Sequence, residues 1–231
     1  MVVAIDGPVA SGKTTVGRAV AAQLGLRFLD TGIMYRAITW LALNMQTDVN
    51  DAEAMGRLAE ICDMSLGRDE QSALITVNGH ELTPRDLASD EVDRNVSSAA
   101  ANPQVRVALV AQQRSIAAGG GIVMVGRDIG SVVLPDADVK LYVDAPPEER
   151  ARRRFIEQQA KGWDADYQQA LEETIRRDRL DSQRADSPLT VPAGATVIDT
   201  AHMDFDETKA TVVAKIRAAT GVGAQPAPTG G

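Results

Sequence analysis

The sequence Gly7-Pro8-Val9-Ala10-Ser11-Gly12-Lys13-Thr14, close to the amino terminus, fits the pattern G-x-x-x-x-G-K-[ST]. A short apolar run, residues 2–5, precedes it, and apolar side chains at helical spacing follow from Lys13 onward. A buried strand, a glycine-rich loop and a helix in this order form a P-loop, in which backbone N–H groups and the start of the helix face a phosphate chain. The sequence therefore predicts a site for a nucleoside triphosphate.

Four positions in this loop carry most of that chemistry. Gly7 and Gly12 allow backbone torsions that point successive N–H groups at one anion. The Lys13 ammonium is expected to reach the β- and γ-phosphates, and the Thr14 hydroxyl to coordinate Mg²⁺ together with those phosphates and water. The residues predicted to bind ATP are Gly7, Pro8, Val9, Ala10, Ser11, Gly12, Lys13, Thr14 and Thr15.

After the P-loop, apolar runs alternate with segments of helical periodicity. The runs that predict further strands are residues 26–29, 122–125, 139–143 and 195–198. The segments that predict helices are residues 13–24, 31–43, 103–118, 147–161, 166–180 and 205–219. Because such alternation gives parallel strands joined by crossover helices, the expected fold is α/β, a P-loop core with a five-stranded parallel sheet flanked by helices.

One segment interrupts this alternation. It contains a helical stretch at residues 52–62, a β-like stretch at residues 73–77 and an Asn78-Gly79 turn, so we expect an inserted lobe there. The carboxyl-terminal end is rich in proline and glycine and is expected to be a disordered tail. The expected organisation is a core of residues 1–50 and 97–219, an inserted lobe of residues 51–96 and a tail of residues 220–231.

The charge composition argues against two classes of binding partner, nucleic acids and membranes. The 231-residue chain has a net charge of −8, from 32 acidic and 24 basic residues. Nonspecific binding to nucleic acid or to a membrane needs a basic surface, so neither partner is expected, and we expect a monomer. The first residues lack the basic segment of a signal peptide and no apolar run is long enough to span a bilayer, which predicts a cytoplasmic protein.

The cysteine and histidine residues offer little chemistry. A single cysteine, Cys62, permits no internal disulfide, and it is expected to be a small buried side chain. His80 and His202 are far apart without the spacing of metal ligands, and both are expected at the surface.

The residues after the third strand bear on the fate of the γ-phosphate. A GTPase switch would read guanine through an N-K-x-D segment, which this sequence lacks. A motor or transport ATPase usually ends an apolar strand in an acidic residue, whereas residues 122–125 are followed by Gly126-Arg127-Asp128. An arginine there favours a second phosphate-bearing substrate, because its guanidinium binds phosphate in a bidentate manner.

A second candidate site follows the second predicted strand. There the sequence reads Asp30-Thr31-Gly32-Ile33-Met34-Tyr35-Arg36, and a helix that starts near Thr31 would have that residue as its N-cap. Tyr35 and Arg36 would then lie one turn further on, near the cleft at the carboxyl end of the strand. The alternatives are that Thr31 is only a cap and that Arg36 is a solvent-exposed charge.

The arginines are clustered. Eight of the 19 lie between residues 150 and 184, against five lysines in the whole chain, and a general preference for arginine codons does not explain this clustering. Four of the five residues at 150–154 are arginine, and the predicted helix places three of them, Arg150, Arg153 and Arg154, on one side. Residues 176–179 form a second cluster, and a turn at Gly162 would fold both over the γ-phosphate as a lid. The alternative is a solvated charged face.

Taken together, these segments resemble the bacterial cytidylate kinases, P-loop nucleoside monophosphate kinases that phosphorylate CMP and dCMP. The resemblance rests on GPVASGKTT (7–15), LDTGIMYR (29–36), NPQVR (102–106), GRDIG (126–130), DAPPEERARRR (144–154) and RRDRLDSQRADSPL (176–189). It extends to about residue 219. Adenylate and shikimate kinases share the first of these segments but not the set.

The resemblance implies transfer of the γ-phosphate of ATP to CMP or dCMP with Mg²⁺, an enlarged monophosphate-binding lobe at residues 51–96 and a lid at about residues 150–184. The implied CMP-binding residues are Thr31, Tyr35, Arg36, Ser97, Arg106, Arg127, Asp128, Arg177, Asp181 and Arg184. The residues expected to act in catalysis are Lys13, Arg127, Arg153 and Arg154.

Particular roles follow from the same resemblance. Tyr35 would pack against the pyrimidine, and Asp181 would hold a sugar hydroxyl unless it forms an intrahelical ion pair with Arg177. The residues implied to clamp the acceptor phosphate are Arg36, Arg106 and Arg127. Val125 departs from the family, since relatives can carry aspartate there. A nucleotide-binding regulator and a kinase of another small acceptor remain as alternatives.

Overall fold

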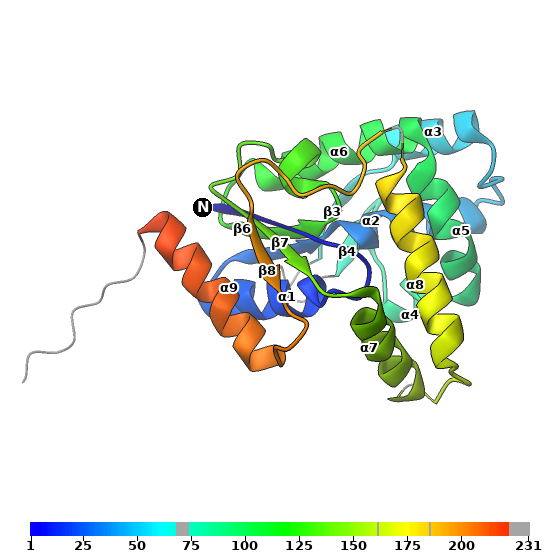
Figure 1. Cartoon of the computed structure of the whole chain (residues 1–231). Coiled ribbons are helices and arrows are strands. Elements are labelled where there is room, and N and C mark those ends of the chain that lie inside the picture. The colour runs from blue at the N-terminus through cyan, green and yellow to red at the C-terminus, as the bar shows by residue number, and fades with distance from the viewer. Residues whose placement is uncertain (68–73, 161, 185, 222–231) are drawn as a thin grey trace, which may run out of the picture.

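Five parallel strands form the central sheet of the computed structural model, which describes residues 1–67, 74–160, 162–184 and 186–221 (Figure 1). In spatial order the strands are β2 (Arg27–Asp30), β6 (Ile122–Gly126), β1 (Val2–Asp6), β7 (Val139–Asp144) and β8 (Thr196–Asp199). All four pairings between neighbours are parallel. The α/β fold with a five-stranded parallel sheet is therefore confirmed.

Helices cover both faces of this sheet because its strands are apolar on both sides. On β1, Val3 and Ile5 point to the face covered by α1 (Lys13–Leu24) and α9 (Phe205–Thr220), whereas Ala4 points to the opposite face. The helices α2 (Thr31–Asn44) and α6 (Pro103–Ala117) cover that opposite face. With both faces buried, the carboxyl ends of the strands are the edge left for a ligand.

The segment after α2 builds a second, smaller sheet. Its elements are α3 (Ala52–Ile61), β3 (Met64–Leu66), β4 (Ile75–Val77), β5 (His80–Glu81), α4 (Pro84–Leu87) and α5 (Asp90–Ala101). The expected turn joins β4 to β5 with positive φ angles of 50° at Asn78 and 79° at Gly79, as a tight hairpin requires. Met55, Ile75 and Leu82 from this segment belong to the same apolar cluster as α2 and α6.

The segment expected to act as a lid is a helical hairpin formed by α7 (Pro147–Ala160) and α8 (Tyr167–Ser182), which pack against each other (Figure 1). The expected turn between them includes Gly162, whose φ is 73°. Three expectations fall partly outside the described residues: the strand start at Ala73, the helix end at Lys161 and the tail at residues 222–231. Within the described ranges, no helix has the length and apolarity needed to span a membrane.

Among the described residues, β3, β5, α4, α5 and a turn after β6 were not predicted. Helix α5 was missed because its sequence is mostly polar and alanine-rich, without a wide apolar stripe. A short π-helical turn, η1 (Ile129–Val133), follows β6 and was missed because the residue that holds it lies on a distant strand. The last helix also runs to Thr220, one residue beyond the expected end, where Gly221 closes it with a φ of 66°.

Candidate active site

The P-loop lies between β1 and α1, and its backbone requires glycine at both ends. A Cβ on Gly7 would lie 2.1 Å from the Val143 carbonyl oxygen, and Gly12 has a φ of 88°. The Lys13 side chain is buried beneath the loop, and its Nζ donates a hydrogen bond of 2.9 Å to the Pro8 carbonyl. The loop is thus already folded around the ammonium.

Burial lowers the pKa of Lys13 well below its ordinary value, and the neighbouring Arg127 lowers it further. The carboxylates of Asp30, Asp181 and Asp6 act in the opposite direction. An anion beside Lys13 would favour its charged form, so the position is suited to a phosphate chain.

Thr14 faces a carboxylate that was given no role in the sequence interpretation. Its Oγ1 donates a hydrogen bond of 2.9 Å to Asp30 Oδ2, at the end of β2. A hydroxyl and a carboxylate are the hard oxygen donors that Mg²⁺ prefers, so these residues fit such an ion. The described residues contain no group of three or more His, Cys, Asp or Glu side chains that could hold a metal without help from a ligand.

Asp30 also corrects the expected N-cap of α2. Its Oδ1 accepts a hydrogen bond of 2.9 Å from the Gly32 N–H, so Asp30 and not Thr31 caps the helix. Thr31 is the first helical residue, and its Oγ1 donates to the Val125 carbonyl at 3.1 Å. The aspartate is better placed because a carboxylate one residue before the helix reaches the free N–H groups.

The strand next to β1 ends in a buried arginine–carboxylate pair. Arg106, from α6, donates to Asp128 just after β6, and both side chains are less than a tenth exposed. The Arg106 guanidinium also lies 5.6 Å from the centre of the Tyr35 ring. Burial raises the pKa of Asp128 although Arg106 opposes this, and burial raises the pKa of Tyr35 to about 12. A planar ring and a guanidinium therefore line one wall of the site.

A second ion-pair group joins the end of α8 to the turn after β6. Arg127 Nε donates to Asp181 Oδ2 at 2.8 Å, and Arg184 donates to the other oxygen of the same carboxylate. The alternative of an Asp181–Arg177 pair is wrong, because Arg177 Nε donates to Glu173 at 2.7 Å. Arg127 and Arg184 also lie near enough to Asp128 to affect its pKa, so both groups belong to one site.

Four of the expected CMP-binding residues lie outside this network. Thr31 and Arg177 bind Val125 and Glu173, and the other two are Arg36 and Ser97. Arg36 donates to the Leu87 carbonyl at 2.8 Å and to Asp93 at 2.5 Å, which ties α2 to α4 and α5. Ser97 is exposed on α5, and in the described part of the chain its side chain makes no hydrogen bond. The structure therefore brings together Tyr35, Arg106, Arg127, Asp128, Asp181 and Arg184.

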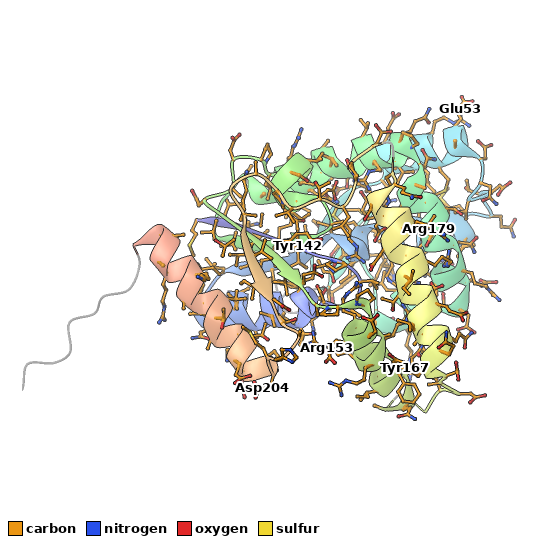
Figure 2. All side chains as sticks on the ribbon, in the orientation of Figure 1. Glu53, Tyr142, Arg153, Tyr167, Arg179 and Asp204 are labelled. Carbon is orange, nitrogen blue, oxygen red and sulfur yellow. The ribbon has the colours of Figure 1, made fainter. Side chains whose placement is uncertain are left out.

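The lid arginines divide into paired and unpaired side chains. Arg153 donates to the Thr200 carbonyl at 2.6 Å, and Figure 2 shows it pointing from α7 toward the loop after β8. Arg154 has no ion-pair partner within the described residues, and burial together with Arg177 lowers its pKa. Arg150, which was expected on the same side of the helix as these two, is buried and paired with Asp178.

Asp6, at the end of β1, was missed as a structural residue of the site. It is fully buried, and its carboxylate accepts hydrogen bonds from the N–H groups of Ile129 at 2.6 Å and Gly130 at 2.8 Å. Burial raises the pKa of Asp6 to about 6, although these hydrogen bonds oppose the shift. The only sequence signal was a charged residue at the end of an apolar strand, which does not reveal its partner.

Comparisons with known proteins show the family of this chain. The cytidylate kinase family model matches residues 3–218. A cytidylate kinase from Pelotomaculum thermopropionicum is 42% identical over 94% of this chain and 96% of its own length. The cytidylate kinase from Shouchella clausii is 43% identical over 91% of this chain and 93% of its own length. The one from Bacillus subtilis is 42% identical over 89% of this chain and 91% of its own length. By its sequence, and with a P-loop beside an arginine-lined site, the chain belongs to the cytidylate kinase family.

Proposed function

We propose that the protein transfers the γ-phosphate of ATP to CMP or dCMP, giving ADP and CDP or dCDP, in pyrimidine nucleotide metabolism in the cytoplasm. The observation that carries this is the placement of the P-loop and of an arginine-bearing turn at the ends of neighbouring strands. The P-loop follows β1 and the Arg127-Asp128 turn follows β6, and Asp6 pairs with Gly126 at the shared edge. Two phosphorylated substrates would therefore meet at this edge.

The arginine network is the proposed acceptor site. Tyr35 would stack against the pyrimidine, and Arg106 and Arg127 would bind the acceptor phosphate with their forked donors. Asp181 would accept a hydrogen bond from a sugar hydroxyl. The remaining proposed contacts are Thr31, Arg36, Ser97, Asp128, Arg177 and Arg184.

Catalysis would consist of positioning and charge stabilisation. The acceptor phosphate oxygen is itself a nucleophile, so the chain needs no strong general base. Lys13, Arg127, Arg153 and Arg154 would offset the charge of the phosphoryl group during transfer. Mg²⁺, which Thr14 and the Asp30 carboxylate would hold, supplies further neutralisation of phosphate charge when bound with ATP.

Two segments would adjust to the substrates. Residues 51–96 are proposed as the monophosphate-binding lobe, and the α7–α8 hairpin within residues 150–184 as the lid. A kinase must exclude water from the γ-phosphate, because otherwise it hydrolyses ATP. The hydrogen bond of Arg153 to the loop after β8 supports this part of the proposal.

The test is a coupled assay of the full chain with ATP, Mg²⁺ and a panel of nucleoside monophosphates. CMP and dCMP should be phosphorylated with the highest kcat/KM. A preference for UMP, AMP or a non-nucleotide acceptor would assign the site to another kinase reaction. ATP binding without any phosphoryl transfer would instead indicate a nucleotide-dependent regulator.

A further inference from the structure

Arg150, at the start of α7, is a buried cation with no place in the proposed reaction. Its residue is 3% exposed, and its guanidinium makes hydrogen bonds in three directions. Nε donates to the Ala145 carbonyl at 2.7 Å, after β7, and Nη1 donates to the Val9 carbonyl at 3.1 Å, in the P-loop. Nη1 and Nη2 bind the two oxygens of Asp178, on α8, at 3.0 and 2.5 Å.

We propose that Arg150 is a positioning residue which, through Asp178, fastens the base of the lid hairpin to the P-loop. The proposal rests on the proposed function for the meaning of the lid. The contacts of Arg150 with Val9 and Asp178 are observed in the structure and do not depend on that function. Val9 and Asp178 lie 141 and 28 positions from Arg150 along the chain.

The P-loop end of this contact bears directly on phosphate binding. A peptide unit is planar, so fixing the Val9 carbonyl also fixes the direction of the Ala10 N–H, which belongs to the same unit. The preceding carbonyl, of Pro8, is held in the same way by Lys13 at 2.9 Å. Ala10 has a φ of 57°, a left-handed conformation that a non-glycine residue adopts only where its surroundings hold it. Arg150 is one of the groups that hold this part of the loop.

The other end of the contact lies beside the acceptor site. Asp178 is one turn before Asp181, whose carboxylate binds Arg127 at 2.8 Å. The last turns of α8 are thus bound to the P-loop, the proposed ATP site, through Arg150, and to the proposed CMP site through Arg127. Lid movement would then occur in the part of the hairpin that lies between Arg150 and Asp178 along the chain, while its base keeps the donor and acceptor sites in register.

The test measures binding of a non-hydrolysable ATP analogue with Mg²⁺, and separately of CMP, to the full chain by calorimetry. The variants are Arg150→Met, Asp178→Asn and the double substitution. The matched control is Arg152→Met, on the same helix. The Arg152 side chain is 59% exposed and, among the described residues, pairs with Glu149 alone. Thermal unfolding of each variant is recorded so that every titration is made well below its midpoint.

Each single substitution should weaken binding of the ATP analogue about tenfold, because a buried charge pair loses one partner. The double variant should bind no more weakly than Arg150→Met, since Asp178 acts through Arg150. CMP binding should change by less than about twofold, and Arg152→Met should match the wild type. In turnover assays of the Arg150 and Asp178 variants, the KM for ATP should rise while the KM for CMP stays at the wild-type value.

Three results would overturn the proposal: losses that multiply in the double variant, equal losses for the ATP analogue and CMP, or unchanged binding. If Arg150→Met does not fold, Arg150→Lys and Asp178→Asn decide the question, because a single ammonium cannot reach all three acceptors and should give the same selective loss. If the wild type binds the ATP analogue but does not phosphorylate CMP, the proposed function fails, while these titrations still decide the role of Arg150.

Discussion

At the scale of single residues, the site depends on charges held inside the protein. Lys13 is buried under the P-loop, and Asp6 is buried one residue before that loop begins. The ammonium would follow the transferred phosphoryl group, whereas the carboxylate holds the turn that carries Arg127 and Asp128. Substitution of each residue should therefore have a distinct effect.

Lys13→Ala should nearly abolish turnover while the fold is kept. Loss of one preorganised charge contact in the transition state costs about 3–4 kcal/mol, which corresponds to a 100- to 1,000-fold fall in kcat. The measurement is kcat with saturating ATP and CMP, with circular dichroism as the control for folding. A variant that keeps the wild-type kcat would remove Lys13 from the reaction.

Asp6→Asn should weaken acceptor binding more than donor binding. An amide has one acceptor oxygen where the carboxylate has two, so one of the N–H groups of Ile129 and Gly130 loses its partner. The KM for CMP should rise and the affinity for an ATP analogue should stay near that of the wild type. Equal changes for both ligands would show that Asp6 supports the fold as a whole.

Asp6 should also make stability depend on pH. Because its pKa in the folded protein is raised from 3.8 to about 6, the folded state binds the proton more strongly than the unfolded state does. The contribution of Asp6 to the free energy of unfolding therefore falls as pH rises from about 4 to 6, by roughly 3 kcal/mol at most. Urea unfolding of wild type and Asp6→Asn over this range measures it, and a difference that is constant with pH would contradict the assignment.

At the scale of elements, arginines from separate helices and turns converge on the proposed acceptor phosphate. Replacing Arg106 or Arg127 by alanine should raise the KM for CMP more than the KM for ATP, and lysine should restore only part of the loss. The control is Arg57→Ala, on α3, whose exposed side chain pairs with Glu53 alone in the part of the chain that the structure describes. Comparable effects on both substrates would indicate that these arginines act only in packing.

The lid should become ordered in its middle more than at its base. With a bisubstrate analogue, hydrogen exchange should slow markedly between Arg153 and Arg177, whereas amides beside Arg150 and Asp178 should already exchange slowly in the free protein. CMP alone should give only part of this protection. Slow exchange along the whole hairpin without ligand, unchanged by the analogue, would describe a rigid support.

Carboxylates of the hairpin neutralise part of its arginine charge. Glu149 pairs with Arg152 and Arg153, and Glu173 pairs with Arg176 and Arg177. Closure would therefore require some of these ion pairs to be exchanged for contacts with phosphate. The side chains of Arg152 and Arg176 are 59% and 49% exposed, so their pairs contribute little. Those of Arg153 and Arg177 are 28% and 25% exposed, so exchanging their pairs costs more.

At the scale of the whole molecule, the sequence was sufficient to predict those features that depend on residues close together in the chain. The P-loop, the parallel strands and the turns at Asn78-Gly79 and Gly162 all follow from residues adjacent in the chain. Partners distant in sequence were not predictable: Asp6 with Ile129, and Arg150 with Asp178, are separated by 123 and 28 residues. A single sequence shows that a charged residue is present but not which group neutralises it, so several arginines expected to face phosphate are bound within the protein.

The apolar cluster that joins the small antiparallel sheet to the central sheet has a consequence for cooperativity. Ile75 and Leu82 are fully buried in the same cluster as Ala4 and Met124, so the small sheet cannot detach without exposing apolar surface of the large one. Heating should therefore unfold both in one transition, with equal calorimetric and van't Hoff enthalpies. A ligand bound only at the acceptor site would then raise the melting temperature of the entire chain.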